Sequence, residues 1–101
     1  LVTEPTPFGL HDLQLAVEMV RALELRCVVA VNRTGLGDDR IHRFCDAEGL
    51  EIVLELPDYR RIAEAYARGE LLIDAIVSLE RYMQHAWERI CAAAERTAVA
   101  P

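Results

Sequence analysis

Residues 26–33, Arg-Cys-Val-Val-Ala-Val-Asn-Arg, constrain the fold of this chain most, because their middle is an uninterrupted apolar run rich in valine. Such a run is typical of a strand that is buried on both faces. Segments with helical periodicity precede and follow it, and strands that alternate with helices form parallel sheets with right-handed connections. The sequence therefore predicts an α/β fold in which this strand is central.

Two more strands are expected beside the central one. Residues 1–3 look like the end of a strand whose beginning is missing, and residues 50–56 form an apolar stretch that Pro57 ends. We expect three parallel strands in sequential spatial order, within a three-layer arrangement of sheet and flanking helices. Residues 1–101 suit a single domain, and the truncated first strand and missing initiator methionine indicate a fragment of a larger protein.

A helix is expected at residues 10–25, where apolar side chains recur three and four positions apart. The two prolines of residues 3–9 assign that segment to a shaped loop before the helix. The broad apolar stripe is typical of a helix that lies on a sheet. Its members are all expected in the core: Leu13, Leu15, Ala16, Val17, Met19, Val20 and Leu23.

Two shorter helices are expected on either side of the third strand. The first follows Asp38 or Asp39, either of which can cap it, and ends at Gly49. The second follows Asp58, which can also act as a cap, and ends near Gly69. Both glycines stand where a left-handed residue is favoured after a helix, so the sequence predicts both helix ends.

A long final helix is expected from about residue 74 to residue 96. Its apolar stripe includes Leu79 and Met83 and continues through either Ala86 or Trp87. A helix of this length reaches roughly 33 Å, the width of a small domain. We therefore expect it to pack across the domain.

The charge of the chain disfavours nucleic acid as a partner. The formal net charge is −6, and a negative chain does not attract a polyanion through general electrostatics. All 11 basic residues are arginine, so the lysine of a phosphate-binding Walker A loop is absent. The sequence contains no long uncharged apolar segment, so it predicts no membrane span.

The three cysteines, Cys27, Cys45 and Cys91, are odd in number and lie within apolar patterns. This pattern fits reduced, buried thiols and a cytoplasmic protein. His42 and Cys45 are three residues apart on a predicted helix, but a metal site needs three or four ligands, and we predict none. No arrangement of nucleophile and base predicts a catalytic site.

Asn32 is the first functional candidate, because it stands at the carboxyl end of the central strand. Ligands of open α/β sheets bind outside these ends. The Asn32 amide can offer a donor and an acceptor there. The same edge is expected to hold residues that follow the other strands.

Several stretches together resemble a known family. In order along the chain they are residues 2–13 (Val-Thr-Glu-Pro-Thr-Pro-Phe-Gly-Leu-His-Asp-Leu), Val31-Asn32-Arg33, Leu56-Pro57-Asp58, Ile62-Ala63 and Gly69. They look like the carboxyl-terminal half of a P-loop ATPase of the MinD/ParA type. The likeness is strongest to MinD-like ATPases with an inserted ferredoxin segment, often labelled cobyrinic acid a,c-diamide synthase. It covers residues 1–73, and residues 74–97 add a terminal helix.

The resemblance implies a nucleotide-binding role at the same edge of the sheet. Asn32 would bond the adenine edge and Pro57 would pack beside the base, while Arg33 and Asp58 would flank the pocket. The parent protein would bind ATP or ADP with magnesium and couple hydrolysis to cofactor or metallocluster handling or to protein positioning. The phosphate loop and the magnesium-holding motif of the family are absent here, so we expect this part alone to hold no nucleotide tightly and to hydrolyse none.

Two kinds of partner are expected. The resemblance implies the missing amino-terminal half of the ATPase domain, and the unpaired first strand predicts self-association into a homo-oligomer. An alternative function, from another class, is a stand-alone interaction domain that uses the exposed strand edge and the long terminal helix to bind another protein.

Overall fold

The computed structural model describes residues 1–35, 38–57, 60–71 and 79–99. Its strands are all parallel and lie in sequential order: β1 (Val2–Thr3), β2 (Val29–Thr34) and β3 (Ile52–Pro57). The described helices are α1 (Pro7–Ala22), α2 (Arg40–Glu48), α3 (Arg60–Ala67) and α5 (Leu79–Val99). The predicted α/β fold, with sequential parallel strands, flanking helices and a long C-terminal helix, is thereby confirmed.

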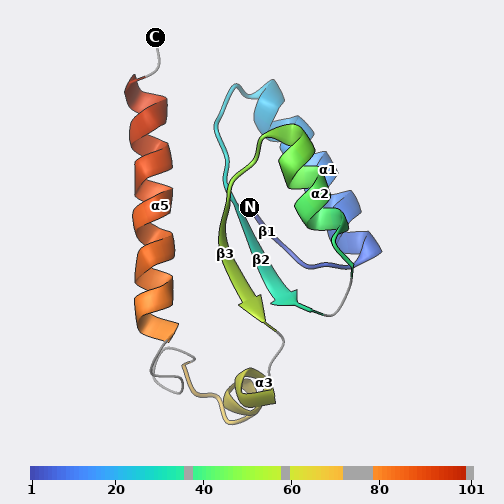
Figure 1. The fold of residues 1–101 in the computed structure, drawn as a ribbon, viewed down its shortest axis with the longest axis vertical. Coiled ribbons are helices and arrows are strands. Elements are labelled where there is room, and N and C mark those ends of the chain that lie inside the picture. Colours follow the sequence, from blue (N-terminus) through green and yellow to red (C-terminus); the bar gives the residue numbers. More distant parts are fainter. Residues whose placement is uncertain (36–37, 58–59, 72–78, 100–101) are drawn as a thin grey trace.

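The helices cover both sides of the sheet (Figure 1). Helices α1 and α2 lie together on one side, and α5 stands beside β3 on the other side. Helix α3 lies beyond the carboxyl end of β3. Among the described helices, none combines the length and the hydropathy that a membrane-spanning helix requires.

The core lies between the sheet and the pair α1 and α2. Alternate residues of β2 face these helices, because successive side chains of a strand point to opposite faces. Each core residue is at most 2% exposed. The members of the core are Leu13, Val17, Val29, Val31, Ile41 and Cys45.

The expectation that the whole apolar stripe of α1 lies in the core is wrong for three side chains. Leu15 is 52% exposed, Met19 65% and Leu23 62%. Leu15 and Met19 each follow a buried residue, Leu13 and Val17, by two positions. Two positions correspond to about 200° around a helix, so these side chains lie on the side of α1 away from the core.

Helix α1 also begins earlier than expected, at Pro7 rather than residue 10. Proline suits the first helical turn, where its missing N–H leaves no bond unmade. The Oγ1 atom of Thr6 accepts a hydrogen bond from the backbone N–H of Gly9 (3.0 Å) and caps the helix. Part of the expected loop therefore belongs to the helix.

Helix α5 packs against β3 through small and apolar side chains. Ala86 is 4% exposed and Leu79 8%, whereas Trp87 is 63% exposed, so Ala86 takes the core position that the sequence left open. Val53 of β3 is likewise buried. Helix α5 contacts β3, and the part of the expected helix that precedes residue 79 lies outside the described residues.

Candidate functional site at the carboxyl edge of the sheet

The pairing of β2 with β3 is irregular at the carboxyl ends of the two strands. Asn32 is paired with Leu56, and Thr34 is paired with Pro57, so two steps along β2 match one step along β3. The residue between, Arg33, therefore occupies a β-bulge. Bulges turn a side chain away from the regular ladder, and they are frequent next to functional sites.

Arg33 adopts a backbone conformation that is unusual for a residue with a side chain. Its φ angle is 58°. The left-handed region costs about 1–2 kcal/mol for a residue other than glycine. Such strain persists only where the surroundings impose it, and it clusters at functional sites. The side chain of Arg33 is exposed.

The bulge fixes the amide of Asn32. Its Oδ1 atom accepts a hydrogen bond from the backbone N–H of Arg33 at 3.0 Å. Because a backbone N–H can only donate, the atom that faces it must be the amide oxygen. One acceptor position of Asn32 is thus used within the protein. The two Nδ2 hydrogens are then the principal groups that Asn32 can offer to a ligand, whereas the sequence suggested an equal donor and acceptor.

Asn32, Arg33 and Pro57 therefore share one edge of the sheet, as the sequence predicted. Pro57 is the last residue of β3 and is half-buried. The fourth predicted residue, Asp58, lies outside the described residues. The structure thus brings three of the four predicted site residues to the same end of two neighbouring strands.

Two residues that sequence analysis did not connect lie near this edge. The Nε2 atom of His42, on α2, is hydrogen-bonded to Oε1 of Glu55, on β3. Cys45, which the spacing offered as a second metal ligand beside His42, belongs instead to the core. Within the described part of the chain, no three His, Cys, Asp or Glu side chains are grouped to hold a metal ion. His42 thus joins α2 to β3.

The acidic residues before α2 are engaged by arginines and by the backbone. Asp38 accepts the backbone N–H of Arg40 through Oδ1 (3.0 Å) and pairs with its Nε atom through Oδ2 (2.7 Å). Asp39 is at the N-cap position, but its side chain accepts no backbone N–H of the helix; it pairs instead with the side chain of Arg43 (2.9 Å). Capping by Asp38 is therefore what the structure supports.

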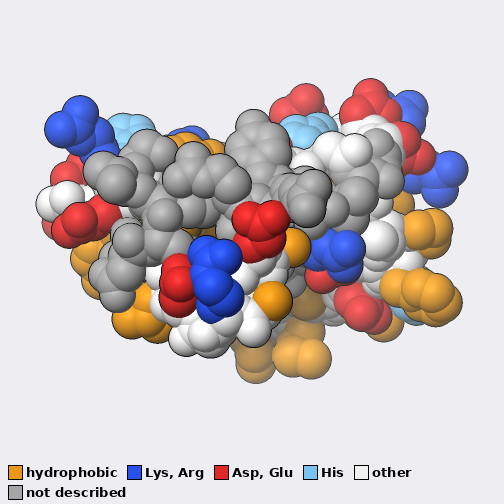
Figure 2. Space-filling model, turned by 90° about the horizontal axis from the view of Figure 1, so that it is seen from below, with side chains coloured by type: hydrophobic (Ala, Val, Ile, Leu, Met, Phe, Trp, Pro, Cys, Tyr) orange, Lys and Arg blue, Asp and Glu red, His pale blue; other side chains and the backbone are white. Residues whose placement is uncertain are grey.

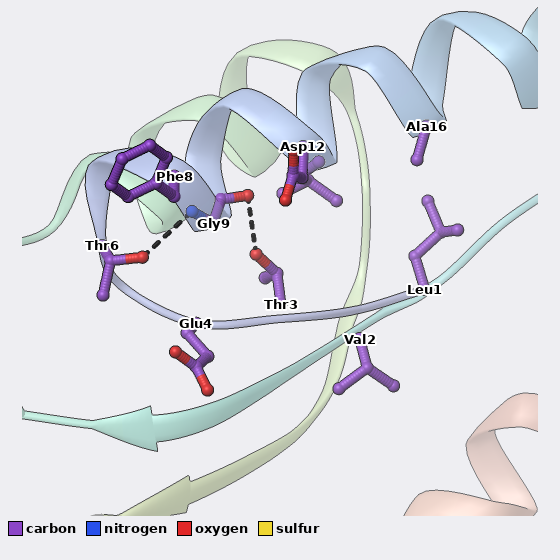
Figure 3. Close-up of a pocket in the computed structure, with 10 residues that line it drawn as sticks. Leu1, Val2, Thr3, Glu4, Thr6, Phe8, Gly9, Asp12 and Ala16 are labelled. Atoms are coloured by element: carbon purple, nitrogen blue, oxygen red, sulfur yellow. Dashed lines mark hydrogen bonds between the residues drawn. The ribbon is translucent and has the colours of Figure 1, made fainter.

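Figure 2 views the molecule from the carboxyl end of the strands. Acidic and basic side chains are interspersed over the described part of this face, so its charge is mixed. A pocket of about 340 Å³ lies elsewhere, beside β1 and the first turns of α1 (Figure 3). Thr3, Phe8, Asp12 and Ala16 are among its lining residues, and Asn32 is not.

The fold is that of an α/β protein, and its candidate site is polar and lies at the carboxyl end of a parallel sheet. The chain is 34% identical over 71 residues to an uncharacterized protein of Methanocaldococcus jannaschii, MJ0579. The match covers 69% of this chain and 23% of that protein, so the chain spans less than a quarter of its relative. No protein-family model matches the chain, and no solved structure matches it.

Proposed function

We propose that this chain is the base-recognition part of a MinD-like ATP-binding protein. The observation that carries the proposal is the amide of Asn32, whose oxygen is fixed by the bulged backbone of Arg33 at the carboxyl edge of the sheet. Within the described residues, the structure shows no hydrogen bond from its Nδ2 atom. An oriented pair of donors suits an acceptor nitrogen on the edge of a nucleobase.

The other residues of this edge suit the flat faces of a base. The ring of Pro57 can pack on one face, and the planar guanidinium of Arg33 can stack on an aromatic system. Asp58 would complete the flank of the pocket, as the resemblance implies. These residues recognise and orient a base, and none of them supplies a nucleophile or a proton-transfer step.

The residues present do not fit the phosphates or the magnesium ion of ATP. The chain contains no lysine, and the acids of the 38–39 segment already pair with Arg40 and Arg43. Phosphate and magnesium would therefore be held by another part of the parent protein, and no hydrolytic step follows from this chain. In the parent, ATP hydrolysis would serve cofactor or metallocluster handling, or protein positioning.

A substitution of Asn32 by aspartate tests the proposal. Asn32→Asp keeps an oxygen for the backbone N–H of Arg33 and removes both side-chain donors. We expect millimolar adenosine to shift the NMR signals of Asn32, Arg33 and Leu56 in the natural chain, and this response to disappear in the variant. Gln84→Glu makes the same change of an exposed amide on α5 and is the matched control. Equal binding by Asn32→Asp and the natural chain would refute the proposal.

The alternative, a stand-alone interaction domain, is favoured by a different observation. Val2 on the edge strand is 78% exposed and Trp87 on the long helix is 63% exposed. The two side chains lie on different elements, and each can contribute apolar surface to a bound protein. A cytoplasmic location suits either function, because Cys27, Cys45 and Cys91 are free thiols.

A further inference from the structure

The side of α1 that faces away from the core carries a row of large apolar side chains, which we call the α1 stripe. Its members are Phe8, Leu15, Met19 and Leu23. They follow one another after seven, four and four residues, a spacing that places side chains on one side of a helix. Each is more than half exposed, whereas Leu13 and Val17 on the core side are at most 2% exposed. Helix α1 is therefore apolar on two opposite sides, which is typical of a helix that is covered on both.

Two carboxylates accompany the α1 stripe. Asp12, three residues before Leu15, lies within the stripe, and Glu18, three residues after Leu15, lies at its border. Both side chains are exposed, and neither makes an ion pair within the described part of the chain. Arg21, the basic residue in the last turn of α1, is bonded to Glu48 of α2 instead. The stripe thus combines apolar surface with negative charge that no arginine of α1 neutralises.

The shape of the α1 stripe suits a second helix. The backbone groups of α1 bond within the helix, so a covering segment must satisfy its own backbone groups, as a helix does. Side chains four residues apart form a ridge that fits the groove of a neighbouring helix. From Phe8 to Leu23 the stripe extends roughly 22 Å, at about 1.5 Å per residue, which gives a covering helix room for about four turns.

We propose that a helix of the same protein, from outside residues 1–101, packs along the α1 stripe. Its apolar side chains would contact the four large side chains of the stripe, and its lysine or arginine residues would pair with Asp12 and Glu18. The match to MJ0579 covers 23% of that relative, so most of the relative's chain lies outside the matched region and is long enough to contain such a helix. This packing goes beyond nucleotide recognition and does not depend on it.

A second copy of this chain fits the α1 stripe less well than a basic helix does. The stripe of a second copy would bring the same carboxylates, those of Asp12 and Glu18, and no lysine or arginine. The carboxylates would then be covered without a positive partner, and a charge that is buried without a partner is costly. A dimer through α1 is therefore a competing outcome of the test.

Met19 reports directly on whether the α1 stripe is covered. Hydrogen peroxide oxidises an exposed methionine to its sulfoxide, and burial slows this reaction. In the purified full-length protein, at a concentration where light scattering shows a monomer, Met19 should be oxidised at least about tenfold more slowly than in residues 1–101 alone. Met83, on α5, is the internal control and should react at the same rate in both. A purified monomer contains no other chain, so this protection would come from its own sequence.

Substitution of the two carboxylates tests whether the covering helix is basic. In the full-length protein, Asp12→Asn combined with Glu18→Gln should speed the oxidation of Met19 about threefold or more, because the basic residues lose their partners. Glu80→Gln combined with Glu95→Gln removes the same charge from exposed positions of α5 and should leave the rate unchanged. Equal oxidation of Met19 in the full-length protein and in residues 1–101 would overturn the proposal. So would protection that appears only as the protein dimerises, or protection that the Asp12 and Glu18 substitutions leave unchanged.

Discussion

The hydroxyl of Tyr82 accepts a hydrogen bond from the backbone N–H of Glu55 (3.1 Å) and donates one to the backbone carbonyl of the same residue (2.9 Å). One side chain thus satisfies both backbone groups that Glu55 presents at the outer edge of β3. Arg89, farther along α5, also bonds Glu51 through Nε (3.0 Å). Side chains of α5 therefore cover the outer edge of β3.

Tyr82→Phe should loosen this edge while it keeps the aromatic ring. Two hydrogen bonds are lost, but the site is partly open to water, so we expect the free energy of unfolding to fall by about 1 kcal/mol. Hydrogen exchange of the Glu55 amide should accelerate relative to that of Val31 in the centre of the sheet. Trp87→Phe, at an exposed aromatic residue of the same helix, is the control. Unchanged exchange at Glu55 would contradict the role given to Tyr82.

Gly9→Ala should destabilise the chain, although alanine usually stabilises a helix by about 1 kcal/mol relative to glycine. A Cβ atom at Gly9 would lie 2.1 Å from the backbone oxygen of Glu4. The turn would have to shift, and with it the hydrogen bond from Thr3 Oγ1 to the carbonyl of Gly9 (2.9 Å). We expect a loss of about 1–3 kcal/mol in chemical denaturation. A gain in stability would show that the turn between Glu4 and Gly9 can shift at little energetic cost.

Among the described residues other than glycine, Glu24 and Arg33 have positive φ angles, of 57° and 58° respectively. Glu24 follows α1, and Leu25 N–H donates to the carbonyl of Val20 there (3.0 Å), as in a glycine-terminated helix end. Glu24→Gly should therefore raise the free energy of unfolding by about 0.5–1 kcal/mol. A decrease would contradict the strain assigned to that residue.

Arg33→Gly should relieve the same kind of strain at the candidate site. We expect the free energy of unfolding to rise by a comparable amount, about 0.5–1 kcal/mol. Arg33→Val should instead lower it by at least about 1 kcal/mol, because a β-branched residue tolerates positive φ poorly. Thermal unfolding of the pair measures both effects. Equal stability of the glycine and valine variants would argue against a left-handed Arg33.

Burial raises the pKa of the Cys45 thiol to about 11, and the negative charge of Asp46 and the neighbouring Cys27 add to the effect. The unfolded chain then loses this proton at lower pH than the folded chain, so stability is full below about pH 9 and falls as pH rises towards 11. The fall approaches about 1.4 kcal/mol per pH unit in this window. Cys45→Ala should reduce the slope even if its overall stability is lower. An unchanged slope would mean that other groups cause the loss; Cys91→Ala is the control.

The regular elements of this fold were predictable because their signals are local. The valine-rich run of β2, and Gly49 and Gly69 after their helices, depend on neighbouring residues alone, and both glycines do have positive φ. The exposure of Leu15 and Met19 was not predicted, because the apolar stripe of α1 is wider than the face of the helix that is buried. A helix stripe shows which residues are apolar but not how wide the surface beneath them is.

The candidate site was predictable only in its position. Asn32 and Pro57 follow strands, so their place at the carboxyl edge could be inferred from the order of elements. The left-handed backbone of Arg33 has no local signature, since neither glycine nor asparagine occupies that position. The backbone N–H of Arg33 donates a hydrogen bond to Asn32 Oδ1 in this conformation, and this bond decides which groups the site offers to a ligand. It could therefore be found only in the structure.

Comparison of adenosine with ATP tests most directly whether this chain recognises the base of a nucleotide and nothing more. Each neutral hydrogen bond contributes about 0.5–1.5 kcal/mol, while millimolar binding needs about 4 kcal/mol, so affinity without a phosphate site is weak. In NMR titrations with and without magnesium, adenosine and ATP should bind with dissociation constants within about threefold of each other, in the millimolar range or weaker. ATP binding at least about tenfold more tightly than adenosine, or signal shifts far from Asn32 and Pro57, would contradict base recognition at this edge.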